Sequence, residues 1–198
     1  MTRLSSIPMP APQVELDELY RMSIDQYHLL AEAGLGEDFP HCELIDGVLV
    51  RKDMKSPEHE DAIAWLLEWL MFSIDRAVFQ VRAGTALTLA ESEPEPDLVV
   101  ISRDTPRTRH AVTAALAIEV SWSSLRRDLN RKAALYAEAG VDEYWVFDVH
   151  ARRIVVHRAP RDGSYGEVRQ ARAGERITGI QAGLPELDVD ELFAATYP

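Results

Sequence analysis

Cysteine is almost absent from this chain of 198 residues, which contains only Cys42. One cysteine cannot form a disulfide within the chain, so the fold must be stable without a cross-link. A chain of this length can bury a core large enough to need neither a disulfide nor a structural metal. Because disulfides are rare in reducing compartments, we expect a cytoplasmic protein.

Long hydrophobic runs are also missing. No segment comes near the roughly 20 consecutive apolar residues that a membrane-spanning helix requires, and the first 12 residues contain no apolar stretch long enough for a secretory signal. Hydrophobic residues make up 46% of the chain and charged residues 27%, which are proportions typical of globular proteins. The sequence therefore predicts a folded protein with no membrane partner.

The chain has little positive charge. Its 21 Lys and Arg are outnumbered by 33 Asp and Glu, and the net charge of −12 gives the whole molecule no general attraction for polyphosphates. The distribution is uneven, because residues 103–132 hold 7 basic and 3 acidic groups, a local balance of +4. A role with nucleic acid must therefore depend on a local site, and a solvated arginine face is an equally good explanation of the basic segment.

Several familiar catalytic and binding motifs are missing as well. The chain has no Walker loop, no H-E-x-x-H sequence and no cysteine pair with zinc-ligand spacing, and Gly34 and Gly36 lack the third glycine of a dinucleotide fingerprint. Ser121, Ser123 and Ser124 cluster without a G-x-S-x-G elbow, which favours turn or cap positions over a nucleophile. The chemistry must be sought among the charged residues.

The chain is predicted to consist of a flexible, proline-rich arm over residues 1–13 and a single domain over residues 14–198. Periodicity and capping patterns predict helices over 24–33, 58–72 and 125–139, with a further helical piece over 14–20. A hairpin is predicted over 43–50 around an Asp-Gly turn, with other strands at 78–81, 85–89, 97–101, 116–120, 143–149, 153–157, 165–171 and 176–180. This pattern is typical of an α/β or α+β domain whose mixed sheet is flanked by helices.

Two acidic residues stand inside apolar runs that read as buried strands. Asp97 opens Asp-Leu-Val-Val-Ile, and Glu119 lies within Leu-Ala-Ile-Glu-Val. A buried carboxylate is costly unless a cation or hydrogen-bond donors compensate it, and two that meet need a shared proton or a divalent ion. Adjacent strands would create a magnesium-type site here, whereas the simpler explanation is a turn cap at Asp97 and an arginine pair at Glu119.

Lys132 strengthens the case for a site. It is one of only three lysines, against 18 arginines. At about 100° per residue, it lies at the centre of the inward face of the predicted helix 125–139, whereas Arg127 and Arg131 fall on the outer face. A lysine that faces a core needs a carboxylate or a phosphate as partner. The alternative, an exposed ion pair with Asp128 one turn earlier, contributes only about 0.5 kcal/mol and does not explain the inward position.

Several short motifs form a recognisable series by their order and spacing. They are Glu43-Leu-Ile-Asp-Gly47, Ser56-Pro-Glu-His59 at a helix start, Pro96-Asp97, Ile118-Glu-Val-Ser121 with Ser123, Asp128…Lys132…Tyr136, and Ala139-Gly-Val-Asp-Glu-Tyr-Trp145 with Asp148. Together they resemble the Uma-two (Uma2) family of restriction-endonuclease-like proteins, within the PD-(D/E)XK superfamily of nucleases. The resemblance extends over residues 23–157, with a looser match to the end.

The resemblance implies a restriction-endonuclease-like α/β core with a divalent-metal site for Mg²⁺ or Mn²⁺. By position, Asp97 is similar to the aspartate of the P-D motif, Glu119 to the second acidic ligand, and the Val120 carbonyl to a further ligand. Ser121 stands where the superfamily lysine is expected, and Lys132 resembles the lysine that the family relocates to the next helix. The other matched positions, without a firm role, are Glu43, His59 and Tyr136.

The expected activity is metal-dependent hydrolysis of phosphodiester bonds, with Asp97, Glu119 and Lys132 as catalytic residues. The expected partner is nucleic acid, DNA in the first place, bound at a local site, and a homodimer joined through the C-terminal hairpins would suit duplex cleavage. Two alternatives stay open. One is a catalytically silent nuclease-fold protein with a regulatory or interaction role, and the other is a metal-dependent hydrolase of a small phosphate ester.

Overall fold

The computed structural model describes residues 19–34, 42–52 and 56–196. The predicted arm over residues 1–13 and most of the predicted helical piece over 14–20 lie outside the described residues. The remaining part of that piece, residues 19 and 20, is not helical. The predicted helix over 24–33 is confirmed as α1 (Ile24–Glu32), which begins with a capping box between Ser23 and Gln26.

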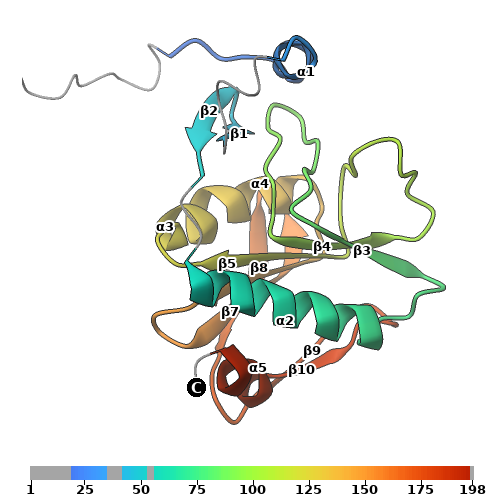
Figure 1. Ribbon diagram of the computed structural model, residues 1–198, viewed down its shortest axis with the longest axis vertical. Helices are drawn as coiled ribbons and strands as arrows, with labels where there is room; N and C mark the ends of the chain where they lie inside the picture. The colour runs from blue at the N-terminus through green and yellow to red at the C-terminus, as the bar shows by residue number, and fades with distance from the viewer. Residues whose placement is uncertain (1–18, 35–41, 53–55, 197–198) are drawn as a thin grey trace, which may run out of the picture.

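A six-stranded mixed sheet forms the centre of the molecule (Figure 1). Its strands lie in sequence order and are β3 (Phe79–Ala83), β4 (Leu98–Ser102), β5 (Leu116–Ser121), β6 (Glu143–Asp148), β7 (Arg153–Arg161) and β8 (Ser164–Ala171). Every neighbouring pair is antiparallel except β5 and β6, which run parallel. A parallel pair requires a crossover connection, and the helical segment between β5 and β6 supplies it.

Helices cover both faces of this sheet. One face packs against α2 (Pro57–Ser73) and α5 (Val189–Thr196), and the other against a segment made of α3 (Leu125–Arg127), a π turn η3 (Asp128–Lys132) and α4 (Ala133–Glu138). The predicted α/β class with a helix-flanked mixed sheet is thus confirmed. None of the helices in the described ranges is long and apolar enough to cross a membrane.

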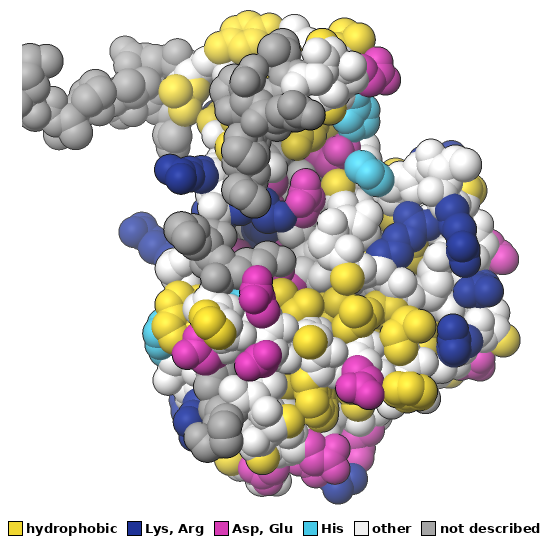
Figure 2. Space-filling view, viewed as in Figure 1, with side chains coloured by type: hydrophobic (Ala, Val, Ile, Leu, Met, Phe, Trp, Pro, Cys, Tyr) yellow, Lys and Arg dark blue, Asp and Glu magenta, His cyan; other side chains and the backbone are white. Residues whose placement is uncertain are grey.

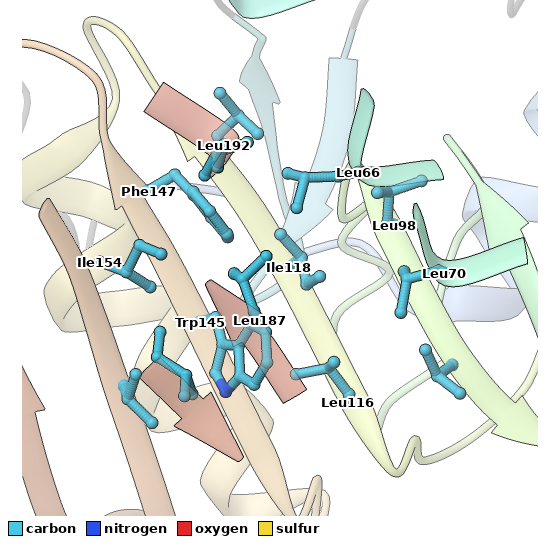
Figure 3. Close-up of a cluster of buried hydrophobic side chains, with 14 of the residues drawn as sticks. Leu66, Leu70, Leu98, Leu116, Ile118, Trp145, Phe147, Ile154, Leu187 and Leu192 are labelled. Carbon is cyan, nitrogen blue, oxygen red and sulfur yellow. The ribbon is translucent and has the colours of Figure 1, made fainter. Parts of the chain in front are cut away.

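The larger part of the core lies between the sheet and the α2 and α5 helices (Figure 3). Leu66 and Leu70 of α2 and Leu192 of α5 point toward Ile118 of β5 and Phe147 of β6. Because side chains alternate along a strand, the residues between these point to the opposite face, where Tyr136 of α4 and Tyr144 of β6 are fully buried. Strand β5 is buried at every position and therefore serves both layers.

Two small sheets flank the central one. The predicted hairpin over 43–50 is confirmed as β1 (Cys42–Ile45) and β2 (Val48–Arg51), with Asp46 and Gly47 at positive φ in its two-residue turn. A second pair joins β9 (Arg176–Thr178) to β10 (Glu186–Asp188). The hairpin β1–β2 matters for function because it carries Glu43.

Two sequence predictions need correction. The predicted strand over 85–89 is wrong, because only Leu87 forms an isolated bridge, with Ala111. The amides of Leu87 and Leu89 instead bond back to Pro94 and Ser92 within the same loop. The sequence also gave no signal strong enough to predict β10 and α5, which are three and eight residues long.

Substitution of Leu66 tests the larger core. Leu66→Ala removes a fully buried side chain at the α2–sheet contact, and we expect the free energy of unfolding to fall by about 2–5 kcal/mol. Leu29→Ala makes the same change at a residue of α1 that is 62% exposed, and should alter it by less than about 0.5 kcal/mol. Urea denaturation followed by circular dichroism measures both. Equal losses would contradict the assignment of the core.

Acidification should destabilise the fold through His157 of β7. Burial lowers the pKa of His157 below its usual value, and its Nδ1 lies 3.2 Å from the carbonyl oxygen of Tyr144. The unfolded chain therefore takes up this proton at a higher pH than the folded chain, and stability is lost as the pH falls below about 6.5. Urea titrations between pH 7.5 and 5 should show a steeper loss in the native protein than in His157→Gln; parallel curves would exclude this contribution.

Candidate functional site

The β4–β5 register places two carboxylates opposite each other. Leu98 pairs with Ile118 in this antiparallel ladder, so the next residue along each chain, Asp97 and Glu119, also stand opposite. Both are nearly buried, with 9% and 5% of their surface exposed. The Val120 amide donates a hydrogen bond of 2.8 Å to Oδ2 of Asp97, which ties that carboxylate to β5. The predicted meeting of the two acidic residues is therefore what the sheet produces.

The Lys132 ammonium completes the group. Its Nζ lies 2.7 Å from Oε1 of Glu119 and 2.9 Å from Oε2 of Glu43, and only 3% of the residue is exposed. The Tyr136 hydroxyl donates to the same Glu119 oxygen at 3.0 Å. Lys132 thus faces inward, as the helical periodicity predicts, and joins the hairpin, β5 and the crossover helix through one cation.

Asp128 has partners other than Lys132. Its Oδ2 accepts hydrogen bonds from the hydroxyls of Ser121 at 2.6 Å and Ser124 at 2.5 Å, and the residue is buried. The exposed Asp128–Lys132 ion pair considered from the sequence is therefore not the arrangement of this protein. Ser121, which takes the place of the superfamily lysine, acts here as a donor that holds Asp128.

A π turn shapes the crossover helix at the site. Across η3, the Ala133 amide bonds to the carbonyl of Asp128 five residues earlier, so this turn is wider than a regular α-helical turn. The sequence prediction placed Arg127 on the outer face, and that prediction is wrong. Arg127 lines the pocket and its Nε lies 3.8 Å from Oε1 of Glu43, because the wide turn brings a residue five positions before Lys132 to the same side.

Glu43 and His59 also reach the site, from two different elements. Glu43 of β1 is fully buried, and its Oε2 accepts a hydrogen bond of 3.1 Å from the Glu95 amide in addition to the contact with Lys132. His59 stands in the first turn of α2, after the Ser56 cap, with Nε2 at 3.3 Å from Oδ2 of Asp97. All three predicted catalytic residues and both of these auxiliary positions therefore surround one point.

The point is a pocket of about 50 Å³. Its lining comprises Glu43, Lys52, His59, Glu95, Asp97, Glu119, Val120, Trp122, Ser123, Ser124, Arg127, Asp128 and Lys132. Sequence reasoning did not assign Lys52, Glu95 and Trp122 to it. Glu95 lies two residues before Asp97 in an extended segment, and that spacing was an available signal. Lys52, whose Nζ lies 2.6 Å from Oε2 of Glu95, follows the hairpin and offered none.

Negative charge is in excess in the pocket. Burial raises the pKa of Glu119 to about 8; Lys132 opposes this rise, and the like charges of Asp128, Asp97 and Glu43 add to it. Burial likewise raises the pKa of Asp128. Burial also acts against the Lys132 ammonium, yet the facing carboxylates of Glu119 and Glu43 outweigh it and raise the pKa of Lys132 above its usual value. The lysine is thus a fixed cation among several carboxylates.

The donor set suits a hard divalent cation. Within the described ranges, no three His, Cys, Asp or Glu side chains form a ready-made cluster, which argues against a zinc-type cage. Magnesium keeps several water ligands and usually needs only one or two carboxylates from the protein. The buried oxygens Glu43 Oε1 and Asp128 Oδ1 accept no hydrogen bond from the described residues, so the negative charge around Asp97 and Glu119 is incompletely compensated.

Comparisons with known proteins agree with this architecture. The model of the Uma2 family, described as "Putative restriction endonuclease", matches residues 24–190. The crystal structure of "a putative nuclease belonging to DUF820" from Anabaena variabilis is similar with a TM-score of 0.70 and 13% sequence identity, over 88% of this chain and 99% of that chain. At this identity the likeness shows a shared fold. None of the curated proteins compared with the chain matches it.

Removal of the Lys132 charge should be costly for stability. Lys132→Met leaves the carboxylates of Glu43 and Glu119 buried without their cation, and we expect a loss of about 3–5 kcal/mol at pH 7 in EDTA. Lys52→Met breaks a half-exposed pair and should cost less than about 1 kcal/mol. Urea denaturation compares the two. Adding Glu119→Gln to Lys132→Met should restore part of the loss, and equal losses in the two single variants would contradict the role of Lys132.

Proposed function

The chain belongs to the Uma2 family, and on this premise we propose that it is a divalent-metal-dependent endonuclease acting on phosphodiester bonds of nucleic acid, DNA in the first place. One observation carries the proposal. Asp97 and Glu119 stand opposite each other at a buried pocket that the Lys132 ammonium also reaches. Two carboxylates and an amine at one point are the groups that metal-assisted phosphodiester hydrolysis requires.

Asp97, Glu119 and the Val120 carbonyl would hold the cation, Mg²⁺ or Mn²⁺. When bound, such a cation makes a water ligand more acidic and neutralises charge that develops on the phosphate. The protein fixes both carboxylates beforehand: the Val120 amide and His59 hold Asp97, and Tyr136 holds Glu119. Fixed ligands of this kind lower the reorganisation needed at the moment of reaction.

Lys132 serves as a donor of positive charge and not as a base. Because its pKa is raised, the amine carries its proton at neutral pH, and it can donate hydrogen bonds to a phosphate oxygen or to the attacking water. Its two carboxylate partners keep it at the pocket. A role as proton acceptor, which the sequence left open, would require the opposite shift of its pKa.

The surface next to the pocket suits a polyanionic substrate. A neighbouring hollow of about 620 Å³ is lined by Ser123, Ser124, Arg126, Arg127, Asn130 and Arg131, and it shares Ser123, Ser124 and Arg127 with the catalytic pocket. Hydroxyl, amide and guanidinium groups are the usual donors to phosphate oxygens. A strand whose scissile phosphate enters the pocket would find donors for its flanking phosphates here.

Asp97→Asn is the sharpest test of the activity. It keeps the shape of the side chain but removes the charge that would bind the cation, and we expect Mg²⁺-dependent or Mn²⁺-dependent cleavage of single-stranded or duplex DNA to fall at least about 100-fold. The matched control is Asp61→Asn on the exposed side of α2, which should stay within about twofold. Gel assays of cleavage and calorimetric titration with Mg²⁺ measure activity and binding separately.

The same measurements distinguish the alternatives. Absence of metal binding by the native protein would leave a silent nuclease-fold protein, and metal binding with cleavage of a small phosphodiester alone would favour a small-substrate hydrolase. Metal binding with unchanged cleavage in Asp97→Asn would refute the assignment of that ligand. Homodimer formation stays a prediction, and the exposed Val168 of β8 and Ile180 after β9 are the apolar side chains that it would cover.

A further inference from the structure

A second cationic surface lies apart from the catalytic pocket. It is a groove of about 930 Å³ between α1, β3 and the loop that joins β4 to β5, and Arg82, Arg107 and Arg109 line it. Dark blue side chains gather on the side of the molecule where this loop lies (Figure 2). The arginines of the loop belong to the basic segment 103–132, whose other half forms the crossover helix at the site.

The loop is held in place by two side chains of β3. The Gln80 amide donates to the carbonyls of Ser102, Arg103 and Thr105 at 3.1, 3.3 and 3.0 Å. The Arg82 guanidinium donates to the carbonyls of Pro106 and Arg109 at 3.0 and 3.1 Å. These bonds fix the backbone from which Arg107 and Arg109 extend, and a surface that is ordered beforehand loses less entropy on binding.

The positive charge of this groove is not neutralised from within the described part of the chain. No carboxylate there forms an ion pair with Arg82, Arg107 or Arg109, and the partners of Arg82 are neutral carbonyl groups. Elsewhere the chain pairs its arginines with acids, as in Arg153 with Asp148 and Arg158 with Glu143. In a protein of net charge −12, three unpaired guanidinium groups at one groove point to an anionic partner.

The groove adjoins the catalytic pocket through one loop. Glu93 is buried beneath it, where its carboxylate lies 2.8 Å from His28 Nε2, 2.8 Å from the Thr88 hydroxyl and 3.4 Å from His110 Nδ1. The Glu93 amide bonds to the carbonyl of Leu44 at 2.7 Å, directly beside Glu43 of the site. The same loop ends at Asp97, so one strand of a bound polymer could follow it from the groove to the pocket.

From these observations we propose that the groove binds the phosphate backbone of the nucleic-acid substrate at a distance from the bond that is cut. This inference rests on the proposed function. Arg107 and Arg109 contact the phosphates, since planar guanidinium groups match phosphate oxygens and such contacts position a substrate without reading its sequence. An acidic protein surface is the competing partner, and a solvated arginine face without a partner is the third case.

The test measures binding without turnover. A fluorescent DNA of 30 nucleotides, single-stranded or duplex, is titrated with the full chain in EDTA at several salt concentrations, and anisotropy gives the Kd. Arg107→Gln with Arg109→Gln should weaken binding about tenfold or more at low salt. Loss of two phosphate contacts should also reduce the slope of log K against log salt by about 1.8 for duplex DNA or about 1.4 for single strands.

The control is Arg161→Gln with Arg172→Gln, which removes the same charge from exposed positions at the end of β7 and after β8. It should leave Kd nearly unchanged. Equal weakening in both pairs, an unchanged slope in the groove variant, or no DNA binding by the native protein would overturn the proposal. If the native protein binds DNA through the groove but never cleaves it, the proposed function fails while the groove assignment stands.

Discussion

The Lys132 ammonium is the interaction on which the site depends. It bridges Glu43 of the β1–β2 hairpin and Glu119 of the central strand β5, and it extends from the crossover helix that follows that strand. Buried carboxylates repel one another strongly, so these elements could not pack together without a cation between them. The same charge that allows the elements to approach is then available to a phosphate, which makes the structural and the chemical roles of Lys132 inseparable.

The sheet determines which side chains meet this cation. Alternation along β5 sends Ile118 into the core under α2 and Glu119 toward the crossover helix, and the antiparallel register brings Asp97 beside it. A shift of register by one residue would exchange the two faces and bury the carboxylate in the α2 layer. The hydrophobic layer therefore specifies the position of the acidic residues, although it contacts no substrate.

The sequence predicted most of the sheet and the meeting of Asp97, Glu119 and Lys132, because each depends on a local period of two or 3.6 residues. It failed where geometry departs from that period. The π turn moved Arg127 to the pocket, and no periodic rule anticipates an inserted residue in a helical turn. Lys52 was missed for another reason, since its place depends on how the hairpin docks, which is a tertiary property.

Arginine use separates structural cations from those left for a partner. On the outer sheet, guanidinium groups such as Arg153 and Arg158 are paired with acids of the neighbouring strand, so their charge contributes to the sheet and not to an external field. At the groove beside β3 the guanidinium groups of Arg82, Arg107 and Arg109 keep their full charge. An acidic chain repels polyanions over most of its surface, so its affinity for them must arise where cations are unpaired. The distribution of ion pairs, more than the net charge, therefore decides where a nucleic acid can bind this protein.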